Sequence, residues 1–172
     1  QRGWIVSPTY DLSRKIFREV YWKLHKYLPF LIADSSEGRM YIKLVNGSEL
    51  WGKSADNPTS LLGEGLNFLI NDEAARMQDM VWKEALRPTL ADREGWCMNV
   101  TTPKGKNWVL EEFSRTGEDH ESWQFGTITN PFIKPEEIEN ARLTIPETIF
   151  RQEWLGEFID EAGSVFRNIE GC

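Results

Sequence analysis

The chain has 172 residues, of which 40% are hydrophobic and 27% charged, the composition of an ordinary globular domain. Its formal net charge of −7 argues against a generally basic nucleic-acid-binding protein. The two cysteines, Cys97 and Cys172, lie far apart and form no zinc-ligand framework with the two histidines. No apolar run approaches the ~20 residues that span a bilayer. No signal peptide opens the chain, so we expect a cytoplasmic protein.

Three elements are predicted in the first third of the chain. The apolar segment 3–7 predicts a strand. A helix follows, capped by Thr9 or Asp11 and ended by Pro29, with apolar residues at a spacing of about 3.6. Alternating apolar residues over 39–51, around an Asn-Gly pair, predict an antiparallel hairpin at the edge of a sheet.

The next segment contains a short apolar run that ends in two adjacent carboxylates. A short helix is predicted to begin at Pro58 and to end at Gly63. The run 66–71 suits a buried central strand, and Asp72 and Glu73 follow it directly. Ligands of open α/β sheets bind at the carboxyl ends of the strands, so the sequence predicts a site at these acids.

Such a pair of acids has a specific use in nucleotide hydrolysis. Asp72 can hold Mg²⁺ through water, because this ion prefers one or two carboxylates together with its own waters and phosphate oxygens. Glu73 can orient and polarise the attacking water. The simpler alternative is the start of a helix, where the helix dipole favours acidic residues.

The second half of the chain continues the alternation of strands and helices. This order, with several strands nearly continuous in apolar residues, predicts a three-layer α/β sandwich with a mostly parallel central sheet. The further predicted elements are a helix after Ala75 that runs to Pro88 with a continuation to Leu90, a strand over 96–100, a helix capped by Asn107, a strand over 122–129, a helix opening at Pro135, and a helix over 146–158.

Small polar or acidic groups follow three of the predicted strands, and the set is more specific than any one member. The three groups are Ser7-Pro8-Thr9-Tyr10, Asp72-Glu73 and Thr101-Thr102-Pro103-Lys104-Gly105. In this arrangement the chain resembles the ATPase domain of the large terminase subunit, the DNA-packaging motor of tailed bacteriophages. The resemblance covers nearly the whole chain in order.

Five segments resemble motifs of that family. They are 4–10, like the strand and turn after the phosphate-binding helix; 65–75, like the Walker B segment; 100–105, like the coupling motif; 152–158, like the end of the domain; and 163–166, like the start of the passage into a nuclease domain.

The resemblance implies a P-loop NTPase-like fold and ATP hydrolysis with Mg²⁺. It also implies a homo-oligomeric ring on the capsid portal protein, a small terminase subunit as partner, and double-stranded DNA as the substrate that is moved. We expect residues 1–158 to be an ATPase domain fragment that starts after the Walker A region. Residues 159–172 are expected to be a linker towards a nuclease domain.

The resemblance also implies roles for individual residues. Asp72 would be the acid on the magnesium side and Glu73 the catalytic acid. Thr101 and Thr102 would sense the nucleotide and pass its state to parts that grip DNA, although a plain turn before a proline is the alternative. Arg39 is the preferred candidate for the arginine that completes a neighbouring site in the ring, and Arg151 is a second candidate.

One part of the family pattern is missing from the sequence. The Walker A loop, a glycine-rich turn ending in Gly-Lys-Ser/Thr, would lie upstream of Trp4, and the 172 residues contain no such loop. The tripeptide Gly52-Lys53-Ser54 is present, but the interval from Gly47 to Gly52 lies inside the predicted hairpin and not between a strand and a helix, so we interpret it as coincidence. Without the loop, the lysine and amides that cradle phosphates are missing. We therefore expect this chain alone to bind ATP poorly or not at all and to be inactive.

Two other functions are compatible with the sequence. A helicase-like DNA motor fragment would suit the segments 7–9 and 72–75, although no second motor core with an arginine motif is present. A non-catalytic remnant would keep the fold and a structural or assembly surface, for which the 8 tryptophans could supply anchors.

Overall fold

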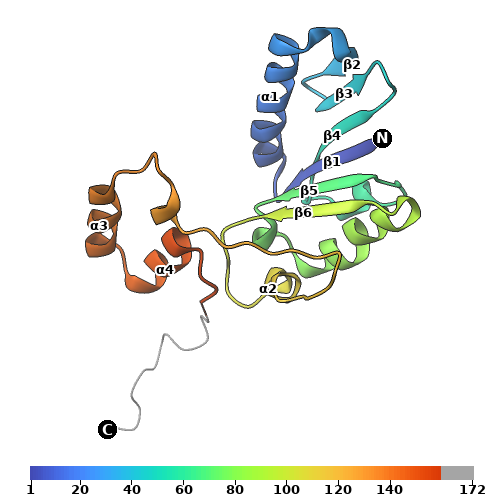
Figure 1. Ribbon diagram of the computed structural model, residues 1–172. Coiled ribbons are helices and arrows are strands. Elements are labelled where there is room, and N and C mark those ends of the chain that lie inside the picture. The colour runs from blue at the N-terminus through green and yellow to red at the C-terminus, as the bar shows by residue number, and fades with distance from the viewer. Residues whose placement is uncertain (160–172) are drawn as a thin grey trace. The chain divides into compact units, whose positions relative to one another are not determined.

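A six-stranded mixed sheet forms the centre of the first part of the chain, with strand order β2-β3-β4-β1-β5-β6 (Figure 1). The computed structural model describes residues 1–159. Strands β4, β1, β5 and β6 run parallel to one another, whereas β2–β3 and β3–β4 pair antiparallel at one side of the sheet. The strands are β1 (Arg2–Ser7), β2 (Ile32–Ser36), β3 (Tyr41–Leu44), β4 (Glu49–Ser54), β5 (Phe68–Asp72) and β6 (Trp96–Val100).

Helices account for most of the remaining regular structure. Within residues 1–159 no helix is long and apolar enough to cross a membrane. The α-helices are α1 (Tyr10–Tyr27), α2 (Trp108–Phe113), α3 (Pro135–Thr144) and α4 (Glu147–Leu155). The shorter 3₁₀ and π segments are η1 (Pro29–Leu31), η2 (Pro58–Leu61), η3 (Ala74–Arg76), η4 (Val81–Leu86), η5 (Arg87–Arg93) and η6 (Thr127–Thr129).

Helix α1 begins and packs as its sequence predicts. Thr9 has an extended backbone and its side chain accepts the Leu12 N–H, which is N-cap geometry. Phe17 is fully buried and packs with Met40 and Ile42, so the apolar stripe of α1 covers the β3–β4 side of the sheet. Figure 1 shows the helical segment that follows β5 on the opposite side of the sheet from α1, and this arrangement confirms the predicted three-layer α/β fold class.

The antiparallel edge of the sheet contains one strand more than predicted. The hairpin of β3 and β4 is present, and β4 continues into the parallel part by pairing with β1. Strand β2 lies outside β3 and was missed, because the sequence Ile-Ala-Asp-Ser-Ser has neither alternation nor strong β-propensity. An edge strand needs only one bonded neighbour, and β3 supplies it.

The segment after the two acids is helical in a different way from the prediction. The chain first makes the 3₁₀ turn η3, and Met77 is extended before the longer helical segment begins. Inside that segment Pro88 has no N–H to donate, and the Arg87 N–H bonds to the Trp82 carbonyl, five residues back. The helix does not end before this proline. It widens into the π-helix η4, and the helical segment continues through η5 to Arg93.

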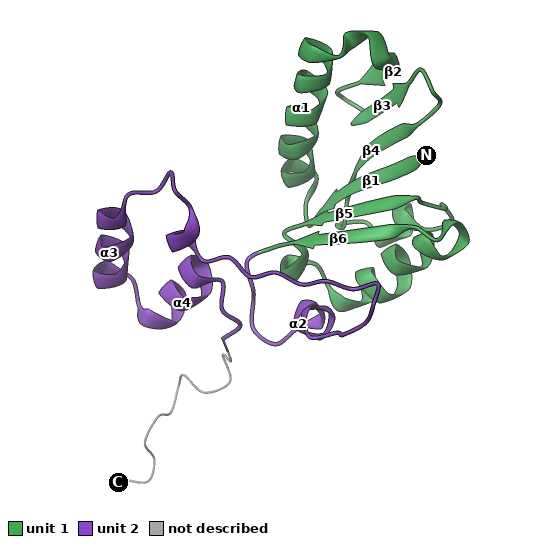
Figure 2. Ribbon diagram, in the orientation of Figure 1, with its two compact units in different colours: residues 1–101 green, residues 102–172 purple. Residues whose placement is uncertain are grey.

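The chain divides into two compact units, Gln1–Thr101 and Thr102–Cys172 (Figure 2). In the second unit Asn107 caps α2 as predicted, since its side chain accepts the Val109 N–H. Helices α3 and α4 pack through Ile138, Ala141 and Phe150. The expected single domain over 1–158 stays a prediction, and almost all of the expected linker 159–172, including segment 163–166, lies outside the described residues.

The strand predicted over 122–129 is wrong. Residues 122–126 have no regular secondary structure, and η6 occupies 127–129. Trp123 and Phe125 are 63% and 75% exposed. A strand is stable only where a neighbour satisfies its backbone groups, and among the described residues this segment has no strand partner.

Candidate functional site

The candidate site lies at the carboxyl edge of the parallel strands in the first unit. Strand β5 ends at Asp72, and Asp72 stands in register with Val100, the last residue of β6. Glu73 and Thr101, which follow these two strands, are therefore attached to neighbouring strand ends at the same edge of the sheet. This is the placement that the sequence predicts for Glu73 and Thr101.

Asp72 is half-buried at the tip of β5. Burial raises the pKa of its carboxyl group, and the nearby charge of Glu73 raises it further, while a hydrogen bond from the Glu73 backbone partly offsets both effects. Two carboxylates at one exposed strand tip are hard oxygen donors of the kind that Mg²⁺ takes while keeping its own waters. Among residues 1–159 no group of three or more His, Cys, Asp and Glu could hold a metal by itself. The donor set thus fits a partly hydrated Mg²⁺ rather than a closed metal cage.

Glu73 begins a tight turn at the end of β5. Its backbone is left-handed, with φ 52° and ψ 39°, a conformation that non-glycine residues adopt at a cost of about 1 kcal/mol or more. The Arg76 N–H bonds to the Glu73 carbonyl at 2.9 Å and closes η3 directly after the acid. The acid thus stands at the start of a single 3₁₀ turn and not at the start of a long helix.

Thr101 is joined to this turn by a hydrogen bond across the two strands. Its Oγ1 accepts the N–H of Ala75 at 3.1 Å, two residues after Glu73. The structure thus brings Asp72, Glu73 and Thr101 together. Thr102 is half-buried and is the first residue of the second unit.

The two strands are also linked one residue below their tips. Asn71 is fully buried, and its Nδ2 donates to Asn99 Oδ1 at 2.8 Å, the residue in register with it on β6. Asn71 Oδ1 has no hydrogen-bond partner among the described residues. The sequence analysis missed this pair, although an asparagine at the same position in two apolar strands was a visible signal.

Arg76 is a second residue that the sequence analysis missed. Its Nε donates to Glu73 Oε2 at 2.9 Å, and the spacing of three residues on a turn is the signal that could have found it. The two arginines named from the resemblance lie elsewhere. Arg39 precedes β3 with its guanidinium 5.7 Å from the Tyr41 ring centre, and Arg151 of α4 pairs with Glu157. Their expected role stays a prediction.

The tripeptide at the end of the predicted hairpin is not a phosphate loop. Gly52, Lys53 and Ser54 lie within strand β4 and not between a strand and a helix. The Lys53 ammonium lies 5.0 Å from the Trp4 ring centre and 5.4 Å from that of Trp51. This lysine therefore packs over aromatic faces of the sheet.

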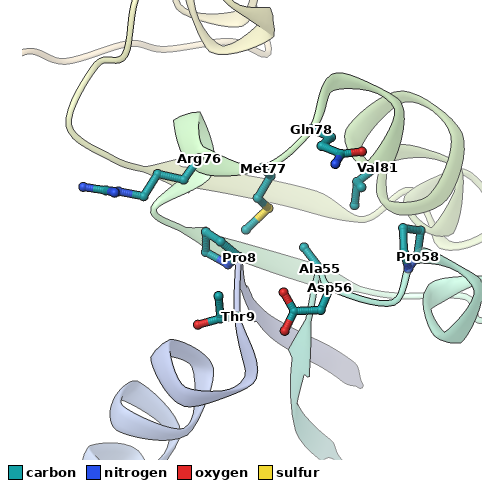
Figure 3. Close-up of a pocket in the computed structure, with 9 residues that line it drawn as sticks. All are labelled: Pro8, Thr9, Ala55, Asp56, Pro58, Arg76, Met77, Gln78 and Val81. Carbon is teal, nitrogen blue, oxygen red and sulfur yellow. The ribbon is translucent and has the colours of Figure 1, made fainter.

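A pocket of about 370 Å³ opens beside the ends of β1 and β4 (Figure 3). Asp56 on its wall accepts the Tyr10 N–H at the start of α1, at 3.3 Å. Neither Asp72 nor Glu73 lines the pocket, and Arg76 belongs both to its wall and to the ion pair with Glu73. The lining residues are Pro8, Thr9, Ala55, Asp56, Pro58, Arg76, Met77, Gln78 and Val81.

Comparison with known sequences gives consistent matches. A family model described as terminase large subunit, T4likevirus-type, N-terminal, matches residues 6–170. The terminase large subunit of Thermus phage G20c is 34% identical over 203 residues, covering 98% of this chain and 42% of that protein. The terminase large subunit of Escherichia phage T5 is 31% identical, covering 94% of this chain and 38% of that protein. The chain thus spans less than half the length of these curated relatives.

Solved structures give a matching result. The large terminase ATPase domain of Thermus phage P74-26 superposes with a TM-score of 0.81 at 34% identity, covering 92% of this chain and 77% of that domain. A large terminase from a thermophilic bacteriophage, solved in complex with ADP, superposes with a TM-score of 0.73 at 14% identity, which is a likeness of fold alone.

Proposed function

Since this chain belongs to the T4likevirus-type N-terminal family of large terminase subunits, we propose that it forms the main part of an ATP-hydrolysing domain. In the whole protein this domain would couple ATP hydrolysis to the movement of double-stranded DNA into a capsid. The observation that carries the proposal is the turn at the end of β5, where Asp72 and Glu73 stand beside Thr101 at the end of β6.

The two acids have separate roles in this proposal. Asp72 would hold Mg²⁺ through water, and the ion would supply positive charge against the phosphate oxygens. Glu73 orients and polarises the water that attacks the terminal phosphate. The raised pKa of Asp72 is typical of a carboxyl group at a functional site.

Thr101 provides the mechanical link between the two strand tips. Because its hydroxyl holds the Ala75 amide, a displacement of Thr101 would shift the turn that carries Glu73. A threonine hydroxyl both accepts and donates, so the same group could respond to the nucleotide. We assign Thr101 and Thr102 to this coupling role and Arg39 to the role of the arginine acting on a neighbouring copy.

An open part of the sheet supports the view that another segment completes the nucleotide site. Trp96, Met98 and Val100 are 56%, 47% and 47% exposed on one face of β6, and within residues 1–159 no strand pairs with the outer edge of β6. Parallel sheets are normally covered on both faces. The related ATPase domain is longer than this chain, which covers 77% of it. We therefore propose that the Walker A loop belongs to a part of the protein outside these 172 residues.

The wider assignments follow from family membership. We propose that the whole protein acts as a ring of identical subunits, together with a portal protein and a small terminase subunit, in the cytoplasm of the infected host.

The decisive test is the substitution Glu73→Gln in the full-length protein. We expect ATP hydrolysis to be abolished and ATP binding to be retained, because the amide keeps the shape of the side chain and removes its charge. Glu139→Gln is the matched control, since Glu139 also pairs with an arginine three residues later, Arg142, on the exposed surface of α3. Normal turnover of the Glu73→Gln protein would refute the proposed function.

A further inference from the structure

Arg76 carries the ion pair with Glu73, and we propose that it is the positioning residue for this carboxylate during ATP hydrolysis. The inference depends on the proposed function, because it assigns Arg76 a role through Glu73. Arg76 lies three residues after Glu73, just beyond the acidic pair Asp72-Glu73. Three features of the turn support it, namely its geometry, its charge and its anchoring.

The geometry brings the two side chains to the same side of one turn. The left-handed backbone of Glu73 starts η3, and the backbone hydrogen bond from Arg76 N–H to the Glu73 carbonyl closes it at 2.9 Å. The side-chain hydrogen bond, from Arg76 Nε to Glu73 Oε2, is also 2.9 Å. A second bond between the same two residues fixes the direction of the carboxylate relative to the backbone. Oε1 of Glu73 accepts no hydrogen bond from a described residue and is left for water.

The charge of Arg76 opposes a repulsion at the strand tip. Asp72 and Glu73 are adjacent carboxylates at the end of β5. Like charges on adjacent residues repel each other. Within residues 1–159 the pair with Arg76 is the only salt bridge that Glu73 makes. The guanidinium therefore holds Glu73 against this repulsion.

Arg76 is attached to a well-fixed part of the chain. The residue before it, Ala75, is held by Thr101 Oγ1, and the residue after it, Met77, is 5% exposed. The stem of Arg76 lines the pocket beside β1, and its guanidinium points away from that pocket (Figure 3). A group that positions a reacting residue must itself be held, and the neighbours of Arg76 provide this support.

The effect expected is on catalysis and not on stability. An exposed ion pair three residues apart contributes little to folding, whereas misplacing a catalytic group by about 1 Å can slow a reaction ~100-fold. In the full-length protein, Arg76→Ala should lower kcat about 10- to 100-fold and leave KM for ATP unchanged. Arg76→Lys should restore part of kcat, because it keeps the charge without the planar fork.

The matched control is Arg115→Ala. Arg115 pairs with Glu112 three residues earlier at 3.0 Å and is as exposed as Arg76, at 48% against 47%. We expect kcat of this variant to stay within twofold of the wild type. Arg76→Gln, which keeps the stem, replaces Arg76→Ala if the alanine variant fails to fold.

Comparison with Glu73→Gln separates this inference from the proposed function. Arg76→Ala should keep a measurable fraction of kcat, because Glu73 is still present, whereas Glu73→Gln should have none. A kcat of Arg76→Ala within twofold of wild type while Glu73→Gln is inactive would overturn the role of Arg76 alone. Normal hydrolysis by Glu73→Gln would instead reject the proposed function, and with it the inference.

Discussion

Replacing Asn71 by leucine should leave the protein as stable as before or make it more stable. Asn71 is fully buried, its Nδ2 donates to Asn99 Oδ1 at 2.8 Å and to Cys97 Sγ at 3.6 Å, and its Oδ1 has no partner among the described residues. A hydrogen bond contributes about 1 kcal/mol net, and a buried unpaired acceptor costs about 1–3 kcal/mol. Asn71→Leu loses the first and relieves the second in a side chain of similar size. We therefore expect the free energy of unfolding to rise by about 0–2 kcal/mol.

The partner residue should behave in the opposite way. Asn99→Leu removes the oxygen acceptor and leaves Nδ2 of the buried Asn71 with only the weak sulfur acceptor of Cys97, so the free energy of unfolding should fall by about 1–3 kcal/mol. Urea unfolding followed by tryptophan fluorescence measures both values. A loss of more than about 2 kcal/mol in Asn71→Leu, or equal losses in the two variants, would refute the reasoning, since the cross-strand bond would then dominate over the unpaired oxygen.

Four further outcomes are expected. Phe17→Ala should lower the free energy of unfolding by about 3–5 kcal/mol in urea titrations, because Phe17 is fully buried. Trp22 lies on the same helix and is 56% exposed, so Trp22→Ala should change the free energy of unfolding by less than about 0.5 kcal/mol. Thr9→Ala should cost about 1 kcal/mol through the lost N-cap of α1 and Thr9→Ser should recover most of it; equal thermal midpoints for the wild type and Thr9→Ala would contradict this. Because the pKa of Asp72 is raised on folding, the folded state binds its proton more tightly, and stability should fall as pH rises from the ordinary carboxyl value through the raised one. Urea midpoints across pH should show this decline in the wild type and a smaller one in Asp72→Asn. Calorimetric titration of the 172-residue chain with ATP should show weak or undetectable binding, and micromolar affinity would contradict the absence of a phosphate loop.

Local sequence patterns predicted the helices and strands whose formation is decided by residues within the element itself. Strands β1, β5 and β6 follow from apolar runs, and α1 follows from its stripe and from Thr9. The two acids at the end of β5 were recognisable because polar residues after a buried parallel strand must emerge at the sheet edge. Where a residue's neighbours along the chain decide its structure, the sequence pattern was sufficient.

The tertiary structure decided the features that depend on a partner distant in sequence or on an unusual backbone. Strand β2 exists because β3 completes its hydrogen bonds, and the segment 122–129 is not a strand because no described strand pairs with it. The contacts of Arg76 and Thr101 need the left-handed backbone of Glu73 and the register between β5 and β6. Backbone pairing and register are properties of the assembled sheet, so composition and periodicity do not contain them.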